Sequence, residues 1–306
     1  MSTNSLAPIA LFVYNRPKHT SITLESLIKN KLSSESTLYI FSEGPKINAK
    51  KNEIQKIRET RSLIRSRKWC KNNFIFESKT NMGLANSIIS GINKVLENHD
   101  KIIVLEDDLY LSKFFLEFMN LSLNRYSNNK NIMQISGYVY PIKNQNNSFF
   151  QNYISSWGWG TWKRSWNLYI DDINILLDKI ESKKNIFNKV QDYYSMLLKQ
   201  KNGYIDSWAI KWNASVCINN GIVLYPNKSF VRNIGFDKYG IHCKNEWYAK
   251  HFIKQELSTI LEVNYPNIID IDKNATEKIK TFLKKIDRPP LMIKFKEKIK
   301  IILRIK

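Results

Sequence analysis

Three consecutive carboxylates are the residues of this chain whose type and spacing most directly predict chemistry. Glu106, Asp107 and Asp108 follow the apolar run 102–105, and the apolar segment after them predicts a helix. A buried strand that ends in these residues places negative charge at one edge of a sheet, which costs folding free energy unless a cation or a hydrogen-bonding ligand lies there. The pattern therefore predicts a metal or sugar site. The alternative is a plain strand-to-helix connection, because the first turn of a helix also favours acidic residues.

The ligand types also indicate which metal would bind. Carboxylate oxygens are hard ligands that favour Mg²⁺ or Mn²⁺. Residues 106–108 have no neighbouring Cys or His that would indicate a Zn²⁺ site. Open α/β sheets bind ligands beyond the carboxyl ends of their strands, where these carboxylates would lie. We therefore expect a divalent cation, Mn²⁺ or Mg²⁺, as the cofactor.

Alternating strands and helices must position these carboxylates. Strands are expected at residues 8–14, 37–41 and 73–76 and before the carboxylates, with helices starting at residue 20 or 21, through 54–64 and over 87–97. Short connections between such elements predict an α/β fold with a parallel sheet wound in the Rossmann manner. Further on, strands are expected at 131–136 and 221–225 and a long helical segment at 170–200.

The other strand ends bring polar groups to the same edge of the sheet. After the first strand, Asn15 precedes Arg16, which can hold a phosphate or a base, and Glu43 can accept a hydrogen bond from an imide N–H. The turn Asn81–Gly83 exposes backbone N–H groups ahead of a helix. The chain has neither a G-x-x-x-x-G-K-[ST] loop nor a G-x-G-x-x-G turn. These residues leave open a nucleotide that is held by side chains and a metal.

Tryptophans mark the second half of the chain, with four between residues 157 and 166. Tryptophans separated by glycine suit neither a helix nor a plain strand, but they can form flat apolar platforms on which sugar rings stack. The alternative is that they fill the core between two subdomains. Farther along, Asp206 begins what looks like a capped helix, so it is either the cap or a catalytic carboxylate. A glycine-punctuated loop can lay Arg232 and His242 over a bound phosphate or metal.

Composition and charge narrow the class of protein and its partners. The 306 residues are 43% hydrophobic and 12% aromatic, which excludes a disordered chain, and the odd count of three cysteines favours a reducing cytosol. Residues 46–71 hold ten Lys or Arg against two Glu, and residues 274–306 hold eleven against three acidic residues, within a net charge of +21. Such basic blocks favour an anionic partner. After Pro289-Pro290, residues 291–306 predict a basic amphipathic helix suited to an anionic membrane surface, or else to packing on the domain.

The chain resembles glycosyltransferases of the GT-A fold, with the match to bacterial family-2-type enzymes and a more distant one to the eukaryotic inverting β-1,2-N-acetylglucosaminyltransferases. The resemblance spans residues 8 to about 245 and rests on Val13-Tyr-Asn-Arg-Pro17, Ser42-Glu-Gly44, Asn81-Met-Gly-Leu-Ala85, residues 106–108, Asp206-Ser-Trp208 and the loop Gly235–Cys243. It implies a GT-A domain whose nucleotide-sugar half is residues 1–125 and whose acceptor half is residues 126–265. Residues 266–306 are expected to form a basic amphipathic tail.

The resemblance also implies roles for single residues. Asp108 and His242 correspond to metal ligands, and Asp206 corresponds to the general base of inverting members. The residues that correspond to binding positions for the nucleotide-sugar are Asn15, Arg16, Glu43, Asn81, Gly83, Glu106 and Asp107. Trp157, Trp159 and Trp208 are expected to bind the acceptor.

These inferences predict a metal-dependent, inverting transferase that moves a sugar from a nucleotide-sugar, expected to be a UDP-sugar, to a glycan or lipid-linked glycan in surface polysaccharide synthesis. We expect it in the cytoplasm, peripheral on the inner face of a bacterial membrane. Alternatives are a retaining transferase, a non-catalytic scaffold and a nucleic-acid-binding protein. The last is disfavoured because the carboxylates would repel a phosphate backbone, so no nucleic-acid partner is expected.

Overall fold

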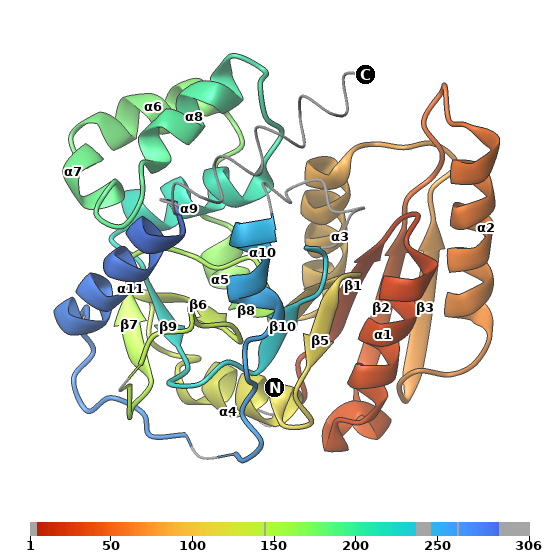
Figure 1. Cartoon of the computed structure of the whole chain (residues 1–306), viewed down its shortest axis with the longest axis horizontal. Coiled ribbons are helices and arrows are strands. Elements are labelled where there is room, and N and C mark those ends of the chain that lie inside the picture. The colour runs from red at the N-terminus through yellow and green to blue at the C-terminus, as the bar shows by residue number, and fades with distance from the viewer. Residues whose placement is uncertain (1–4, 144, 237–245, 262, 288–306) are drawn as a thin grey trace.

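The first half of the chain alternates strands and helices as expected (Figure 1). The computed structural model describes residues 5–143, 145–236, 246–261 and 263–287. The strands are β1 (Ile9–Val13), β2 (Thr37–Ser42), β3 (Asn72–Glu77) and β4 (Lys101–Glu106). Between them lie α1 (Pro17–Ile28), the 3₁₀ turn η1 (Lys31–Glu35), α2 (Lys51–Arg65) and α3 (Leu84–Asn98). All four strands are parallel, which confirms the predicted winding.

The second half continues the same sheet with β6 (Ile132–Ser136), β7 (Phe149–Gln151), β8 (Trp159–Trp162) and β9 (Ile222–Tyr225). The eight strands lie in the order β3-β2-β1-β4-β8-β6-β9-β7. Strand β8 is antiparallel to both β4 and β6, whereas β6 and β9 are parallel. The fold is thus an α/β sheet, mixed and mostly parallel, and β8 joins its two halves. One core cluster runs through both halves.

Helices of the second half cover the sheet and add a small lobe. They are α5 (Lys163–Trp166), α6 (Ile173–Glu181), α7 (Lys184–Phe187), α8 (Tyr193–Lys201), α9 (Trp208–Ile218), α10 (Glu246–Ile253) and α11 (Lys273–Ile286). The expected helical segment 170–200 is divided into three helices, because Asp172 and Asp192 each cap a new start with their side chains. Helices α6 to α9 share a second core cluster around Leu176 and Leu197.

The segment after the carboxylates differs from its prediction. It forms the short strand β5 (Leu109–Leu111), and helix α4 (Phe115–Arg125) begins later. Strand β5 pairs in antiparallel fashion with β10 (Val231–Asn233), so the predicted helix directly after Asp108 is wrong. Leu109 and Leu111 are buried with half-buried Tyr110 between them, an alternation that suits a strand and not a helical face.

The first helix also begins earlier than expected. It starts at Pro17 rather than at residue 20 or 21, and no side chain caps it. Proline suits the first helical position because its fixed φ matches a helix and its missing N–H would have no partner there. Arg16 is consequently the last residue before the helix and lies directly at the edge of the sheet.

Helix α11 belongs to the folded body of the protein. Ala275, Ile279 and Leu283 lie in the main core, and the hydroxyl of Thr276 donates to Oε1 of Gln151 at 2.9 Å. A separate tail starting at residue 266 therefore does not fit the structure, because this helix buries an apolar face against the sheet. The amphipathic segment 291–306 lies outside the described residues. Among the described helices, none has the length and apolar character needed to span a bilayer.

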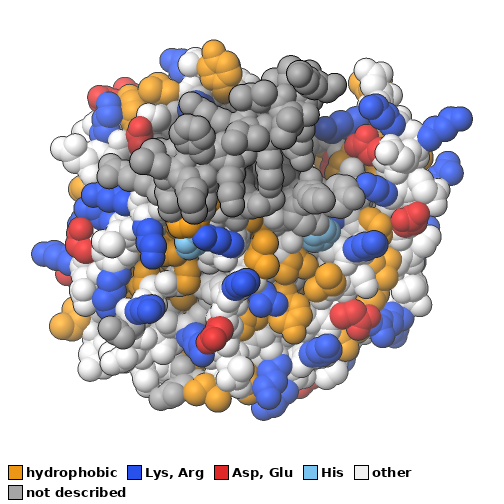
Figure 2. All heavy atoms as spheres, viewed as in Figure 1, with side chains coloured by type: hydrophobic (Ala, Val, Ile, Leu, Met, Phe, Trp, Pro, Cys, Tyr) orange, Lys and Arg blue, Asp and Glu red, His pale blue; other side chains and the backbone are white. Residues whose placement is uncertain are grey.

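Several basic side chains of residues 46–71 form contacts within the fold. Arg65 pairs with Glu77 and Arg67 pairs with Glu25, and the guanidinium of Arg67 lies 4.3 Å from the ring centroid of Trp69. On the face shown in Figure 2 the Lys and Arg side chains are spread among apolar and uncharged ones rather than gathered into a single patch. Part of the first basic block is therefore engaged with the protein itself.

Candidate functional site

The three carboxylates lie where β4 ends, beside the start of α1. Arg16 donates a hydrogen bond from Nη1 to Oδ2 of Asp108 at 2.8 Å, and the same nitrogen lies 3.7 Å from Oδ1 of Asp107. Strands β1 and β4 are neighbours in the sheet, so residues that are 92 positions apart meet at one edge. The structure thus brings together Arg16 and the acidic residues that the sequence singled out.

Burial of these carboxylates disfavours their charged forms. Burial, followed by the charges of Asp108 and Asp107, raises the pKa of Glu106 to about 8. Burial and the charge of Asp108 raise the pKa of Asp107 to about 7. Burial alone would lower the pKa of Arg16, but the adjacent Asp107 and Asp108 outweigh it and raise that pKa. One guanidinium is therefore too little positive charge for three carboxylates, and the site favours a further cation.

Hydrogen bonds fix the backbone around Asp107 and Asp108. The hydroxyl of Thr23 on α1 donates to the carbonyl of Asp107 at 2.8 Å and accepts from the N–H of Leu109 at 3.2 Å. The N–H of Ile234, just after β10, donates to the carbonyl of Asp108 at 2.8 Å. A Cβ at Gly235 would lie 2.1 Å from Oδ2 of Asp108, so only glycine lets this segment approach the carboxylate. The sequence around Thr23 contains no pattern that would predict this contact with residues 107–109.

A second group of residues lies where β2 ends. Oε2 of Glu43 accepts from the N–H of Met82 at 2.7 Å, and burial is the main cause that raises the pKa of Glu43. Asn81 donates from Nδ2 to the carbonyl of Gly44 at 3.2 Å and accepts from the N–H of Gly83 at 3.1 Å. The predicted residues Glu43, Asn81 and Gly83 therefore form one hydrogen-bonded unit that ties two loops together.

Arg61 on α2 stabilises this unit through hydrogen bonds to the ends of β2 and β3. The sequence did not predict this role. Its Nη2 donates to the carbonyls of Ser78 at 2.6 Å and Glu43 at 3.2 Å, and its Nε donates to the hydroxyl of Ser42 at 3.3 Å. The sequence offers no way to separate Arg61 from the other basic residues of its block. Its role follows only from the way in which α2 packs beside the ends of β2 and β3.

A cavity opens beside Glu43, between the ends of β2 and β3 and helix α3. Its volume is about 470 Å³, and its walls include the rings of Phe41 and Phe76 and the side chains of Glu43 and Lys94. The two rings are stacked with their centroids 5.2 Å apart. Apolar walls with a few polar groups are typical of sites for small molecules such as a nucleobase.

Asp206 lies before α9 in the second half of the chain, and its side chain is near Gly83 in the turn that precedes α3. It is exposed, and its Oδ2 would lie 3.5 Å from a Cβ at Gly83, whose φ is +84°. The interpretation of Asp206 as a helix cap is wrong, because the cap of α9 is Ser207, whose hydroxyl accepts from the N–H of Ile210 at 3.3 Å. The Asp206 carboxylate therefore has no capping role and faces the turn that precedes α3.

The three tryptophans predicted to bind the acceptor have different environments. Trp159 is fully buried and stacks on Trp208 at a centroid distance of 5.2 Å, and Trp208 is only 3% exposed. The prediction that these two bind a sugar is wrong, because their faces are covered by each other and by the core. Trp157 is half-buried and lines a second cavity of about 180 Å³, so it alone of the three borders a space for a ligand.

The remaining candidates lie in or near the segment after β10. His242 is outside the described residues, so its predicted metal role stays a prediction. Arg232 lies on β10 with its guanidinium 5.1 Å from the ring centroid of Tyr110, and its buried Nε has no hydrogen-bond partner in the described part of the chain. Asn15 is half-buried beside Arg16 at the end of β1.

The carboxylates fit a hard divalent cation that a ligand helps to hold. Across the described ranges, no three His, Cys, Asp or Glu side chains converge on one point as a complete metal site. Mg²⁺ and similar ions are commonly bound by one or two carboxylates together with phosphate oxygens of the substrate. The surplus negative charge at residues 106–108 matches a site that substrate phosphates complete, and of the two carboxylates beside Arg16, Asp108 is more accessible than Asp107.

These pKa shifts predict how the stability of the metal-free protein depends on pH. Glu106 and Asp107 titrate near 4 in an unfolded chain, and their folded pKa values are raised to about 8 and about 7. The stability that these two groups contribute is complete below their pKa values in the unfolded chain. It is lost as the pH rises through their pKa values in the folded protein. We expect the free energy of unfolding, and with it the melting temperature, to fall between pH 5 and pH 8 as these two groups ionise.

Calorimetric melting across this pH range checks the prediction. A Glu106→Gln variant should show a shallower fall, because one of the two titrating groups is gone. Added Mn²⁺ should raise the melting temperature more at pH 8 than at pH 5, since ionised carboxylates bind the ion more tightly. A stability that is constant or increases from pH 5 to pH 8 would contradict the prediction.

Comparisons with known proteins concern the fold. No protein-family model and no curated protein matches the chain. It is similar to the structure of residues 1–349 of TarS from S. aureus, with 10% identity, a TM-score of 0.42, and coverage of 82% of this chain and 67% of that one. It is also similar to a second structure of S. aureus TarS, with 10% identity, a TM-score of 0.39, and coverage of 73% of this chain and 36% of that one. With a cytidylyltransferase from Leptospira borgpetersenii serovar Hardjo-bovis the identity is 14% and the TM-score 0.34, and the similarity covers 70% of this chain and 97% of that one. At these values the similarity carries no argument about family, activity or substrate, and the structure itself establishes an α/β fold with a mixed and mostly parallel sheet.

Proposed function

We propose that the protein is a metal-dependent inverting glycosyltransferase, which moves a sugar from a nucleotide-sugar, a UDP-sugar, to a glycan or lipid-linked oligosaccharide. The observation that carries this proposal is the buried acidic end of β4, which Arg16 neutralises only in part. It lies at the edge of the sheet where such folds bind ligands. A divalent cation would supply the missing positive charge, and oxygens of a diphosphate would complete its set of ligands.

The chain's own residues divide the work of the reaction. Glu43 and the cavity beside it would bind the base, while Arg16 would hold a phosphate of the leaving group. Asp206 would accept the proton of the attacking acceptor hydroxyl from the side opposite to the leaving group, so that the configuration at the anomeric carbon inverts. A divalent cation at Asp108 would supply neutralisation of the charge that develops on the leaving diphosphate.

Calorimetric titration of UDP into the protein, with and without Mn²⁺, tests this proposal. We expect binding that depends on Mn²⁺, because the carboxylates repel a diphosphate without it. Parallel titrations with CDP, GDP and dTDP would show which base suits Glu43. Absence of binding by all four nucleotides in the presence of Mn²⁺ would refute the proposed donor.

The C-terminal segment supports a further part of the proposal, a peripheral location on an anionic membrane. Its sequence predicts a basic amphipathic helix over residues 291–306. A protein that lacks these residues should no longer sediment with vesicles of anionic lipid, while its binding of UDP with Mn²⁺ should be unchanged. Undiminished sedimentation of the truncated protein would refute the anchor.

A further inference from the structure

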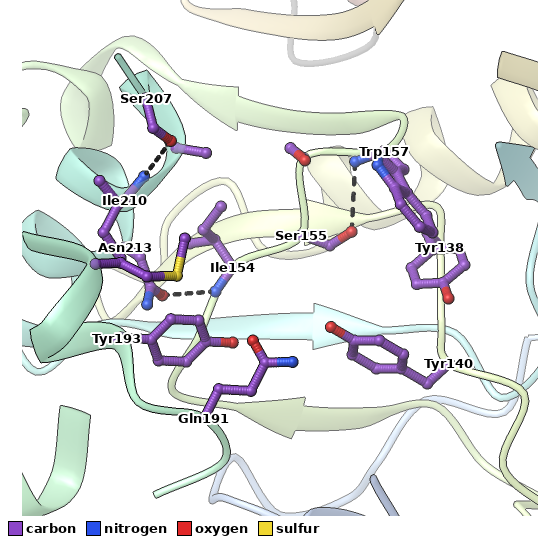
Figure 3. A pocket seen from close by; sticks show the side chains of 13 residues that line it. Tyr138, Tyr140, Ile154, Ser155, Trp157, Gln191, Tyr193, Ser207, Ile210 and Asn213 are labelled. Atoms are coloured by element: carbon purple, nitrogen blue, oxygen red, sulfur yellow. Dashed lines mark hydrogen bonds between the residues drawn. The ribbon is translucent and has the colours of Figure 1, made fainter. Parts of the chain in front are cut away.

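A cavity in the second half of the protein adjoins the segment that carries Asp206. Its volume is about 180 Å³, and it lies between the loops at residues 138–140 and 154–157, the start of α8, and α9 (Figure 3). Ser207, which caps α9, lines the cavity and directly follows Asp206. The cavity therefore adjoins the segment that carries the residue to which we assign the role of base, although Asp206 itself does not line it.

The lining of this cavity is uncharged. None of the described residues that line it is Asp, Glu, Lys, Arg or His, although the chain as a whole carries a net charge of +21. A carboxylate or phosphate placed in the cavity would lose its hydration and gain no cationic partner, which is unfavourable. The lining thus favours an uncharged ligand over the anionic ones that the overall charge of the protein would attract.

Aromatic rings and carboxamides give the cavity its chemistry. Tyr140, Trp157 and Tyr193 supply flat apolar surface, and the side chain of Gln191 projects between the two tyrosines (Figure 3). Aromatic rings combined with a few amide and hydroxyl groups suit a sugar ring, which has apolar faces and hydroxyls around its edge.

Asn213 provides an independent sign of a ligand. It is 3% exposed, and its Oδ1 accepts from the N–H of Ile154 at 2.9 Å. Its buried Nδ2 has no hydrogen-bond partner within the described residues and lies on the side of the carboxamide toward Tyr193 (Figure 3). Buried amide nitrogens are nearly always paired in native proteins, because an unpaired donor costs free energy. A ligand hydroxyl in the cavity would supply the acceptor that Asn213 lacks.

We propose that this cavity binds the terminal sugar of the acceptor and that this sugar is uncharged and of the size of one monosaccharide ring. The inference rests on the proposed function, which it extends by naming the chemical class of the acceptor. Gln191 and Asn213 would bind hydroxyls of the ring, and Trp157 would cover one of its faces. The hydroxyl that reacts would then point toward Asp206.

The experiment measures binding of methyl glycosides by saturation-transfer NMR and titration, with UDP and Mn²⁺ present. The uncharged probes are the methyl glycosides of glucose, galactose, N-acetylglucosamine and rhamnose, and the anionic probe is methyl glucuronide. We expect at least one uncharged glycoside to bind more tightly than the glucuronide. Gln191→Ala should weaken this binding about fivefold, the size expected for one lost hydrogen bond between uncharged groups.

Matched variants keep the test specific. Gln55→Ala removes an exposed glutamine from α2 and should leave glycoside binding unchanged. Asn213→Asp keeps the oxygen that accepts from Ile154 but replaces the donor with a charge, so it should weaken the uncharged probes as well. Both cavity variants should bind UDP with Mn²⁺ as the unmodified protein does.

The outcomes separate this inference from the function on which it rests. If UDP binds with Mn²⁺ but no uncharged glycoside binds up to its solubility limit, the inference fails and the proposed function stands. Equal or tighter binding of the glucuronide, or glycoside binding that Gln191→Ala leaves unchanged, would also overturn the inference. If UDP itself does not bind, the proposed function is refuted, and the inference that rests on it is refuted with it.

Discussion

Replacing Asp206 with asparagine should slow sugar transfer about a thousandfold while leaving the binding of UDP and Mn²⁺ unchanged. A positioned general base contributes roughly 10²- to 10⁴-fold to a reaction, and asparagine has nearly the same shape but cannot accept the proton. The fold should tolerate the change, because Asp206 is exposed and Ser207, not Asp206, caps α9. Initial rates with a radiolabelled UDP-sugar and a glycan acceptor, beside calorimetric titration of UDP, would measure both effects.

Two controls accompany this substitution. Asp178→Asn removes another exposed carboxylate, on α6, and should affect neither rate nor binding. Ser207→Ala removes the helix cap and should lower the free energy of unfolding by about 1 kcal/mol without a thousandfold loss of rate. The anomeric configuration of the product, read by NMR, must be inverted. Full activity of Asp206→Asn with retained configuration would instead favour a retaining transferase.

The first half of the fold could be predicted because its signals are local. Each strand there is an apolar run of the right length with a polar end, and each end falls at the same edge once the sheet is parallel. The meeting of Arg16 with Asp108 follows from that topology alone. The strand β5 was missed because three residues are too few to distinguish a strand from the start of a helix by periodicity.

The second half depends on contacts between distant segments, which sequence patterns do not encode. Trp157 and Trp159 are two positions apart and look alike in sequence, yet Trp159 lies in strand β8 and is completely covered, whereas Trp157 lies in the loop before the strand and is half-buried beside a cavity. Gln191 precedes α8 and Asn213 lies on α9, and the two line the same cavity because α8 and α9 pack together. No local pattern distinguishes them from other amides, so the cavity could be found only in the structure.

Replacing Asp108 with asparagine should abolish the Mn²⁺-dependent binding of UDP, with a loss of affinity of at least about a hundredfold, and with it the transfer reaction. Asparagine can still accept the hydrogen bond that Arg16 donates to Asp108 at 2.8 Å, so the link between α1 and the end of β4 is retained. What is lost is one negative charge and one hard ligand. Titration of UDP at several Mn²⁺ concentrations would measure the effect.

The same substitution makes an opposite prediction for stability, and this separates a lost ligand from a damaged fold. The charge of Asp108 is, after burial, the next cause that raises the pKa of Glu106 and of Asp107, so removing it relieves repulsion among buried groups. The metal-free variant should therefore melt at the same temperature as the unmodified protein or higher at pH 8, whereas a variant that merely misfolds would melt lower. Mn²⁺-dependent UDP binding that survives in a stable Asp108→Asn protein would show that the cation is held elsewhere, and the acidic end of β4 would then have to act on the sugar or the ribose instead.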